Sequence, residues 1–110
     1  MRTKTLWIRD EYLQEILIGW KDIEVRVGYS NIVRLRVGDV LRLNDRYPYV
    51  ITRIGRYGSH EALLEVEEPQ RIAPGMSHEE LLAALRDIYP AEKEALGIIA
   101  LEISPVHTDK

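Results

Sequence analysis

Three ionisable residues, Lys21, Glu24 and Arg26, lie within one short segment that begins at Gly19. In a β-strand, Glu24 and Arg26 are two residues apart and share a face. Gly19 allows the sharp turn that would bring Lys21 beside them. Lys and Arg bind phosphates or carbonyls, whereas Glu accepts hydrogen bonds from amines or acts as a base. The segment therefore predicts a charged ligand cleft, and an exposed salt-bridged strand is the alternative interpretation.

The elements around this segment are short strands and helices. Alternation over 22–27 predicts a strand that turns Ile23, Val25 and Val27 inward. We expect further strands at 5–8, 40–44, 49–57 and 97–103 and helices at 9–18, 59–66 and 77–89.

The helix at 77–89 carries the clearest signals. Ser77 and Glu80 have capping-box spacing, and the sequence Tyr89-Pro90 ends the helix. Its expected apolar face consists of Leu81, Leu82, Leu85 and Ile88.

These elements predict an α+β fold: a small, mostly antiparallel β-barrel of five or six strands with two or three flanking helices. The 110 residues fit a single domain over 1–110, with a core at about 5–103 and a frayed tail at 104–110.

Composition excludes several classes of protein. The chain has no cysteine, so disulfides and thiol chemistry are ruled out. No apolar run is long enough for a membrane span, and no secretory signal is visible, so we expect a cytoplasmic protein. His60, His78 and His107 lack metal-binding spacing, and no phosphate-binding glycine motif occurs. We therefore expect no metal and no cofactor.

The charge is unevenly distributed along the chain. The net charge is −3, which argues against a protein that coats DNA nonspecifically. Residues 1–58 nevertheless hold 11 Lys and Arg against 7 Asp and Glu, whereas residues 59–110 hold 4 against 11. A basic face on an acidic protein is thus expected, and the candidates for a patch that follows a nucleic-acid backbone are Arg34, Arg36, Arg42, Arg46, Arg53 and Arg56.

The charged segment also resembles a known signature. The pattern Gly19-x-Lys21-x-x-Glu24-x-Arg26 is similar to the GxKxxExR motif of the ASCH domain, a small β-barrel related to the PUA fold. The resemblance extends over roughly 5–103 and includes a late helix that ends in Asp-Ile-Tyr-Pro. It implies a PUA-like barrel with a cleft beside the motif, and RNA or a modified nucleoside or nucleotide as the partner.

Residues near the motif complete the predicted site. We expect Lys21, Glu24 and Arg26 to line the cleft, with Tyr29, Asn31 and Arg34 at its edge, because the turn after the strand returns to the same end of the barrel. Aromatic residues that could stack on an unpaired base, or simply pack in the core, are Trp20, Tyr29, Tyr47, Tyr49 and Tyr57.

A hydrolase is the alternative to a binding module. The chain is distantly similar to small ASCH amidohydrolases that deacetylate acetylcytidine, and Lys21 matches their catalytic Lys. Glu24 stands where they have a nucleophilic Thr, and Pro74 falls where they have a Glu before the late helix, although Glu67, Glu68, Glu79 and Glu80 are near in sequence. An enzyme would use Glu24 as base and Lys21 as oxyanion stabiliser, either in such an amidohydrolase or in a ribonuclease.

Overall fold

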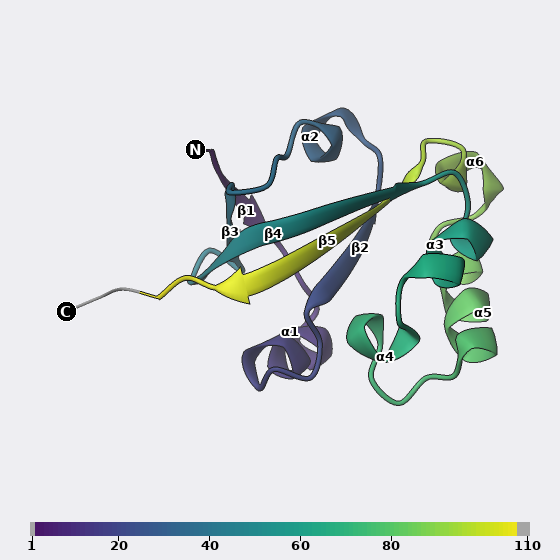
Figure 1. Ribbon diagram of the computed structural model, residues 1–110, viewed down its shortest axis with the longest axis horizontal. Helices are drawn as coiled ribbons and strands as arrows, with labels where there is room; N and C mark the ends of the chain where they lie inside the picture. Colours follow the sequence, from purple (N-terminus) through teal and green to yellow (C-terminus); the bar gives the residue numbers. More distant parts are fainter. Residues whose placement is uncertain (1, 108–110) are drawn as a thin grey trace.

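A computed structural model describes residues 2–107 (Figure 1). The strands are β1 (Thr3–Leu6), β2 (Ile23–Val27), β3 (Val40–Leu43), β4 (Tyr47–Tyr57) and β5 (Ile98–Pro105). The helices are α1 (Asp10–Leu17), α2 (Ser30–Val33), α3 (His60–Val66), α4 (Pro69–Ile72), α5 (His78–Ile88) and α6 (Ala91–Glu94).

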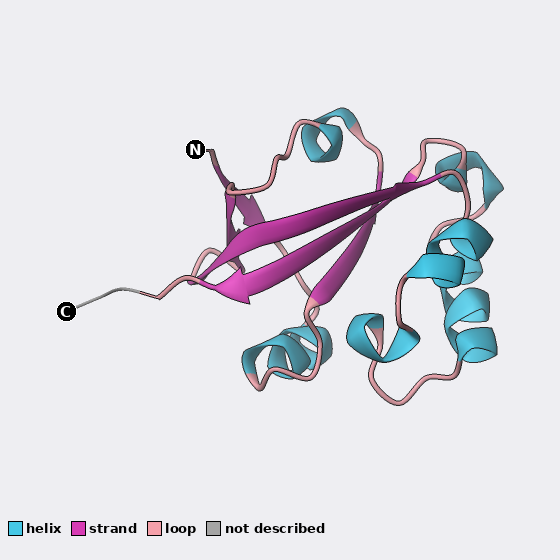
Figure 2. Ribbon diagram, viewed as in Figure 1, coloured by secondary structure: helices cyan, strands magenta, loops and turns pink. Residues whose placement is uncertain are grey.

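The five strands form one curled sheet in the order β1-β3-β4-β5-β2. The β1–β3 pair is parallel and the other three pairs are antiparallel. Figure 2 shows the sheet crossing the molecule, with α3, α4, α5 and α6 gathered at one side and α1 and α2 at opposite margins. The predicted α+β class with a small, mostly antiparallel barrel-like sheet is confirmed, in the form of a half-barrel whose edge strands are β1 and β2.

Both faces of the sheet are covered by apolar cores. Successive residues of β5 point to opposite faces and are buried in different cores. Ile99 and Leu101 belong to one core with residues of α1 and α2, whereas Ile98 and Ala100 belong to a second core with residues of α3, α4 and α5. The alternate residues of β2 are buried as predicted, but they face the helices. They are buried in the second core, against the helices, and not inside the curled sheet: Ile23, Val25 and Val27.

The helices exceed the predicted two or three. Three of the six (α2, α4 and α6) are only four residues long, too short for apolar periodicity to predict them. The capping box of α5 is present: the Ser77 hydroxyl accepts from Glu80 N–H, and the Glu80 carboxylate accepts from Ser77 N–H. Ile88 was expected on the buried face of this helix, but its side chain is 51% exposed.

The ends of the chain differ from the prediction in one respect. Strand β5 continues to Pro105, so part of the expected tail 104–110 is strand. Residues 1 and 108–110 of the predicted domain lie outside the described residues. Over residues 2–107, no helix has the length and apolar character that crossing a bilayer requires.

Candidate nucleotide-binding site

Lys21 is placed by the end of α1 and the start of β2. Gly19 has a φ of +87°, a left-handed conformation that suits glycine and lets the chain leave the helix. Lys21 is buried, with its side chain only 5% exposed. Its ammonium donates to the main-chain oxygens of Ile23 and Ile72 at 2.7 Å each and lies 3.2 Å from Glu24 Oε1. Two of these contacts are hydrogen bonds to main-chain oxygens, and the third is an ion pair.

The other two residues of the motif complete a chain of charges. Arg26 Nε donates to Glu24 Oε2 at 2.8 Å, so each Glu24 oxygen faces one cation. Arg26 Nη2 also donates to the main-chain oxygen of Trp7 at 2.8 Å. Because Trp7 follows edge strand β1 and Arg26 lies on edge strand β2, this bond connects the two edges of the half-barrel.

The open edge of β2 explains why a lysine is buried here. The main-chain oxygen of Asp22 accepts from Ile103 N–H at 2.9 Å, which fixes the hydrogen-bonding pairs between β2 and β5. Since such pairs alternate along an antiparallel ladder, the main-chain groups of Ile23 and Val25 point away from β5. Lys21 satisfies the Ile23 oxygen, and the Tyr89 hydroxyl makes a long contact of 3.5 Å with the Val25 oxygen.

A first cavity of about 300 Å³ lies beside this cluster. It is bounded by β2, by the start of α1, by the end of α4 and by α5, and Lys21, Glu24 and Arg26 all line it. Aromatic side chains also contribute to the walls, namely Trp7, Tyr12 and Tyr89. Ile88 lines the cavity as well, which accounts for its exposure. The volume is at the lower end of the range for small-molecule pockets, which are mostly apolar with a few polar groups.

A second cavity of about 270 Å³ lies between the edge strands β1 and β2. Tyr29 and Asn31, predicted at the edge of the site, line this cavity and not the first one. Arg26 lines both cavities, whereas Arg34 lines neither of these two. The predicted site residues are therefore divided between two adjoining hollows.

Trp7 is the residue that the sequence interpretation missed. It lies within the strand predicted at 5–8, but β1 ends at Leu6, and Trp7 is 67% exposed and lines both cavities. Leu6 and Ile8 on either side of it are buried. Strand alternation alone would have placed Trp7 on the opposite face from these neighbours.

The candidate stacking residues differ in exposure and in whether they line a cavity. Tyr49 is buried in the core, and the Tyr57 hydroxyl donates to Glu67. Tyr47 packs partly against the core, with the Arg46 guanidinium 5.2 Å from its ring centre. Tyr29 and Trp20 are exposed, and of these two only Tyr29 lines one of the two cavities.

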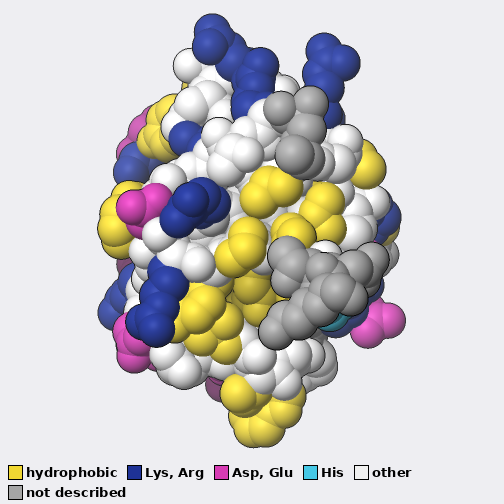
Figure 3. All heavy atoms as spheres, turned by 90° about the vertical axis from the view of Figure 1, so that its left-hand side faces the viewer, with side chains coloured by type: hydrophobic (Ala, Val, Ile, Leu, Met, Phe, Trp, Pro, Cys, Tyr) yellow, Lys and Arg dark blue, Asp and Glu magenta, His cyan; other side chains and the backbone are white. Residues whose placement is uncertain are grey.

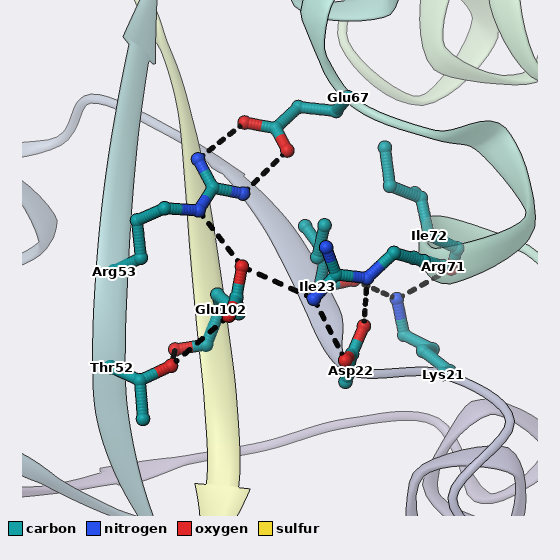
Figure 4. A network of polar contacts seen from close by, with 9 residues as sticks. All are labelled: Lys21, Asp22, Ile23, Thr52, Arg53, Glu67, Arg71, Ile72 and Glu102. Atoms are coloured by element: carbon teal, nitrogen blue, oxygen red, sulfur yellow. Dashed lines mark hydrogen bonds and ion pairs between the residues drawn. The ribbon is translucent and has the colours of Figure 1, made fainter.

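A second polar network holds the helices to the sheet (Figure 4). Arg53 makes a two-pronged contact with Glu67 at 3.0 and 2.6 Å and donates to Glu102 at 2.8 Å. Arg71 lies 3.1 Å from Glu102 and binds Asp22 through two hydrogen bonds of 2.8 and 2.9 Å. The hydrogen bonds from Arg53 hold the pKa values of Glu67 and Glu102 below their ordinary range.

This network removes Arg53 from the predicted basic patch, because its guanidinium is occupied by two carboxylates. Arg42 likewise pairs with Asp45. Figure 3 shows Lys and Arg side chains along the upper and left margins of one face, around a central group of hydrophobic side chains. The basic residues are thus spread around a face and do not form one continuous stripe along it.

The alternative catalytic residues lie away from the cavities. Glu67 is buried in the Arg53 network, and the remaining candidates are exposed: Glu68, Glu79 and Glu80. Among the described residues that line the first cavity, Glu24 is the single acidic one. This lining contains no Ser, Thr, Cys or His.

The histidines do not gather into a site. His60 is fully buried, with Nε2 2.9 Å from the main-chain oxygen of Tyr89 and without a hydrogen-bond partner for Nδ1 among the described residues. In the part of the chain that the structure covers, no three His, Asp or Glu side chains are grouped to hold a metal ion.

Two solved structures are similar to this chain over nearly its whole length. The crystal structure of the hypothetical protein PH0355 from Pyrococcus superposes with a TM-score of 0.87 and 28% identity, covering 96% of this chain and 100% of that one. The solution structure of protein PF0455 from Pyrococcus furiosus gives a TM-score of 0.78 and 29% identity over 98% of this chain and 100% of that one. No family model and no curated protein matches the sequence. The two relatives support the fold, and their names state no activity.

Proposed function

We propose that this protein is an ASCH-like, PUA-like domain that binds RNA or a nucleotide in the first cavity. The observation that carries the proposal is the Lys21–Glu24–Arg26 cluster on the wall of a 300 Å³ cavity that also has aromatic walls. This combination suits a nucleotide. Arg26 offers donors to a phosphate or a base carbonyl, and Glu24 can accept from an exocyclic amine. Trp7 and Tyr12 offer surfaces for an unstacked base.

The contacts of the cluster favour binding over hydrolysis. Lys21 is buried, with its ammonium bonded to two main-chain oxygens and paired with Glu24, so an oxyanion would have to compete with these contacts. Both Glu24 oxygens are already in contact with cations, Lys21 at 3.2 Å and Arg26 at 2.8 Å. Each carboxylate oxygen nevertheless has a second lone pair with which it can accept a hydrogen bond from a ligand.

Filling the cavity tests the proposal. Ala84 on α5 lines the first cavity, whereas its neighbour Ala83 is exposed and does not. Ala84→Phe should abolish the binding of short single-stranded RNA at low salt, and Ala83→Phe should leave it unchanged. Binding by the unmodified protein should weaken steeply as salt rises, because bound phosphates release counterions. Equal binding by both variants would place RNA elsewhere on the surface.

Incubation with acetylcytidine and with single-stranded RNA distinguishes the alternative. The proposal expects retention of RNA and no product from either compound. Deacetylation of acetylcytidine that Ala84→Phe abolishes would instead assign the cavity to an amidohydrolase. Cleavage of the RNA that the same substitution abolishes would assign it to a ribonuclease.

A further inference from the structure

The two cavities adjoin each other and are similar in size, about 300 and 270 Å³. Trp7, Arg26 and Tyr89 line both of them, so these three side chains form a common wall. Two compartments of nearly equal size on either side of one wall match a ligand made of two similar units.

Basic side chains outnumber acidic ones in the walls of the two cavities, and one of them, Arg9, also pairs with Glu11 at 2.9 Å outside the lining. Lys4, Arg9, Lys21 and Arg26 line one or both of them, against Glu24 as the acidic residue among the described lining. This excess contrasts with the net charge of −3 of the whole chain. It favours an anionic ligand, and a chain of nucleotides carries one negative charge between successive units.

The common wall offers what a dinucleotide needs at its centre. The Trp7 side chain is 67% exposed although it lines both hollows, so its ring is accessible to a base. The Arg26 guanidinium has five N–H donors and uses one on Nε for Glu24 and one on Nη2 for Trp7. Its Nη1 donors have no partner among the described residues, and they are therefore available to a phosphate.

We propose that the two cavities together bind two consecutive nucleotides of single-stranded RNA. One base occupies each cavity, the indole of Trp7 stacks at the wall between them, and Arg26 binds the phosphate that joins the two units. This inference rests on the proposed function, because it specifies how many nucleotides that site accepts.

Calorimetric titration with ligands of increasing length tests the inference. The probes are uridine and adenosine 5′-monophosphates, the dinucleotides UpU and ApA, and the corresponding trinucleotides. We expect the affinity to rise at least about 10-fold from monophosphate to dinucleotide, since a second stacked base contributes on that scale. The step from dinucleotide to trinucleotide should be much smaller.

Two tryptophans provide a matched pair of variants. Trp7→Ala should lower dinucleotide affinity about 10-fold, whereas Trp20→Ala, equally exposed at 67% and lining neither cavity, should leave it unchanged. Asn31→Ala, in the second cavity only, should reduce dinucleotide affinity more than monophosphate affinity. Unchanged melting temperatures of all three variants would show that the fold persists.

The outcomes separate the two proposals. A dinucleotide that binds no more tightly than a monophosphate overturns the two-compartment site and leaves nucleotide binding intact. Equal effects of Trp7→Ala and Trp20→Ala also overturn it. Failure of every probe, from the monophosphates to the trinucleotides, to bind the unmodified protein overturns the proposed function itself.

Discussion

The Lys21 ammonium donates to the main-chain oxygen of Ile72 at 2.7 Å, and this bond ties the end of α4 to the start of β2. The neighbouring residues repeat the connection. Asp22 N–H donates to the Arg71 main-chain oxygen at 3.1 Å, and the Arg71 guanidinium returns two bonds to the Asp22 carboxylate. Residues 21–22 are therefore bonded to residues 71–72 through both main chain and side chains. These bonds hold α4 against β2 at the wall of the first cavity.

Lys21→Met should destabilise the protein strongly. The substitution leaves a buried Glu24 with one cation fewer and two main-chain oxygens without their donor, at a cost of about 3–5 kcal/mol in the free energy of unfolding. Urea unfolding measures the loss. Lys93→Ala, at an exposed lysine on α6, is the control and should change stability only slightly. Similar stability of the two variants would show that the buried contacts of Lys21 do not stabilise the fold.

The Arg26→Lys substitution tests whether RNA binding needs the planar guanidinium of Arg26 or only its positive charge. A lysine keeps the positive charge but loses the planar group that binds Glu24 and Trp7 together. We expect RNA affinity to fall about 10-fold. Arg26→Ala removes the charge as well, and it should reduce the slope of log affinity against log salt by about 1. Filter binding over a salt series measures both effects, and an unchanged slope for Arg26→Ala would show that Arg26 contacts no phosphate.

Acid should destabilise the protein through Glu67. Hydrogen bonds from Arg53 lower the pKa of Glu67, so the folded protein holds fewer protons than the unfolded chain at mildly acidic pH. The resulting stability is fully present above the unfolded pKa of about 4.3 and is lost as the pH falls through the folded value.

A pair of glutamate variants measures this contribution. Glu67→Gln should lower stability at pH 7 by about 2 kcal/mol and flatten its dependence on pH below 5. Urea unfolding at pH 7 and pH 3 gives both quantities. Glu65→Gln, at an exposed position on the same helix, should keep the acid dependence of the unmodified protein. A Glu67→Gln protein with that same dependence would refute the assignment.

Ser77→Ala should weaken the helix that forms one wall of the first cavity. The Ser77 hydroxyl caps α5 by accepting from Glu80 N–H, and the loss of such a cap costs about 1 kcal/mol. Thermal unfolding measures the change. Ser30→Ala removes an exposed serine at the first residue of α2, where no side-chain cap is formed, and serves as the control. Equal melting temperatures of the two variants would contradict the role of the cap.

Local signals in the sequence predicted the local structure well. The helices predicted at 59–66 and 77–89 are α3 and α5, and each is capped by the first residue of its predicted range, Ser59 or Ser77, because a cap is decided by residues three positions apart. Alternation predicted β2 because it too depends only on residues close together in the sequence. It could not show that Ile23, Val25 and Val27 pack on helices from the second half of the chain, since both faces of the sheet are covered.

Long-range partners explain what the sequence did not reveal about the site. Lys21 meets Ile72 and Arg26 meets Trp7, and no local spacing encodes either contact. The proximity of Lys21, Glu24 and Arg26 was predictable because four residues of turn and strand separate the first from the last. The division of the site into two cavities was not, because it depends on how the edges of the half-barrel approach each other.

The position of β5 between β4 and β2 has a consequence for synthesis. Residues 98–105 pair with both strands, so β2 acquires its neighbour in the sheet only after they have been made. Lys21, Glu24 and Arg26 leave the ribosome long before that strand does. Because such distant pairing forms slowly, the nascent chain carries these three residues before the sheet that positions them is complete. The proposed binding therefore depends on β5, the strand that joins β2 to β4.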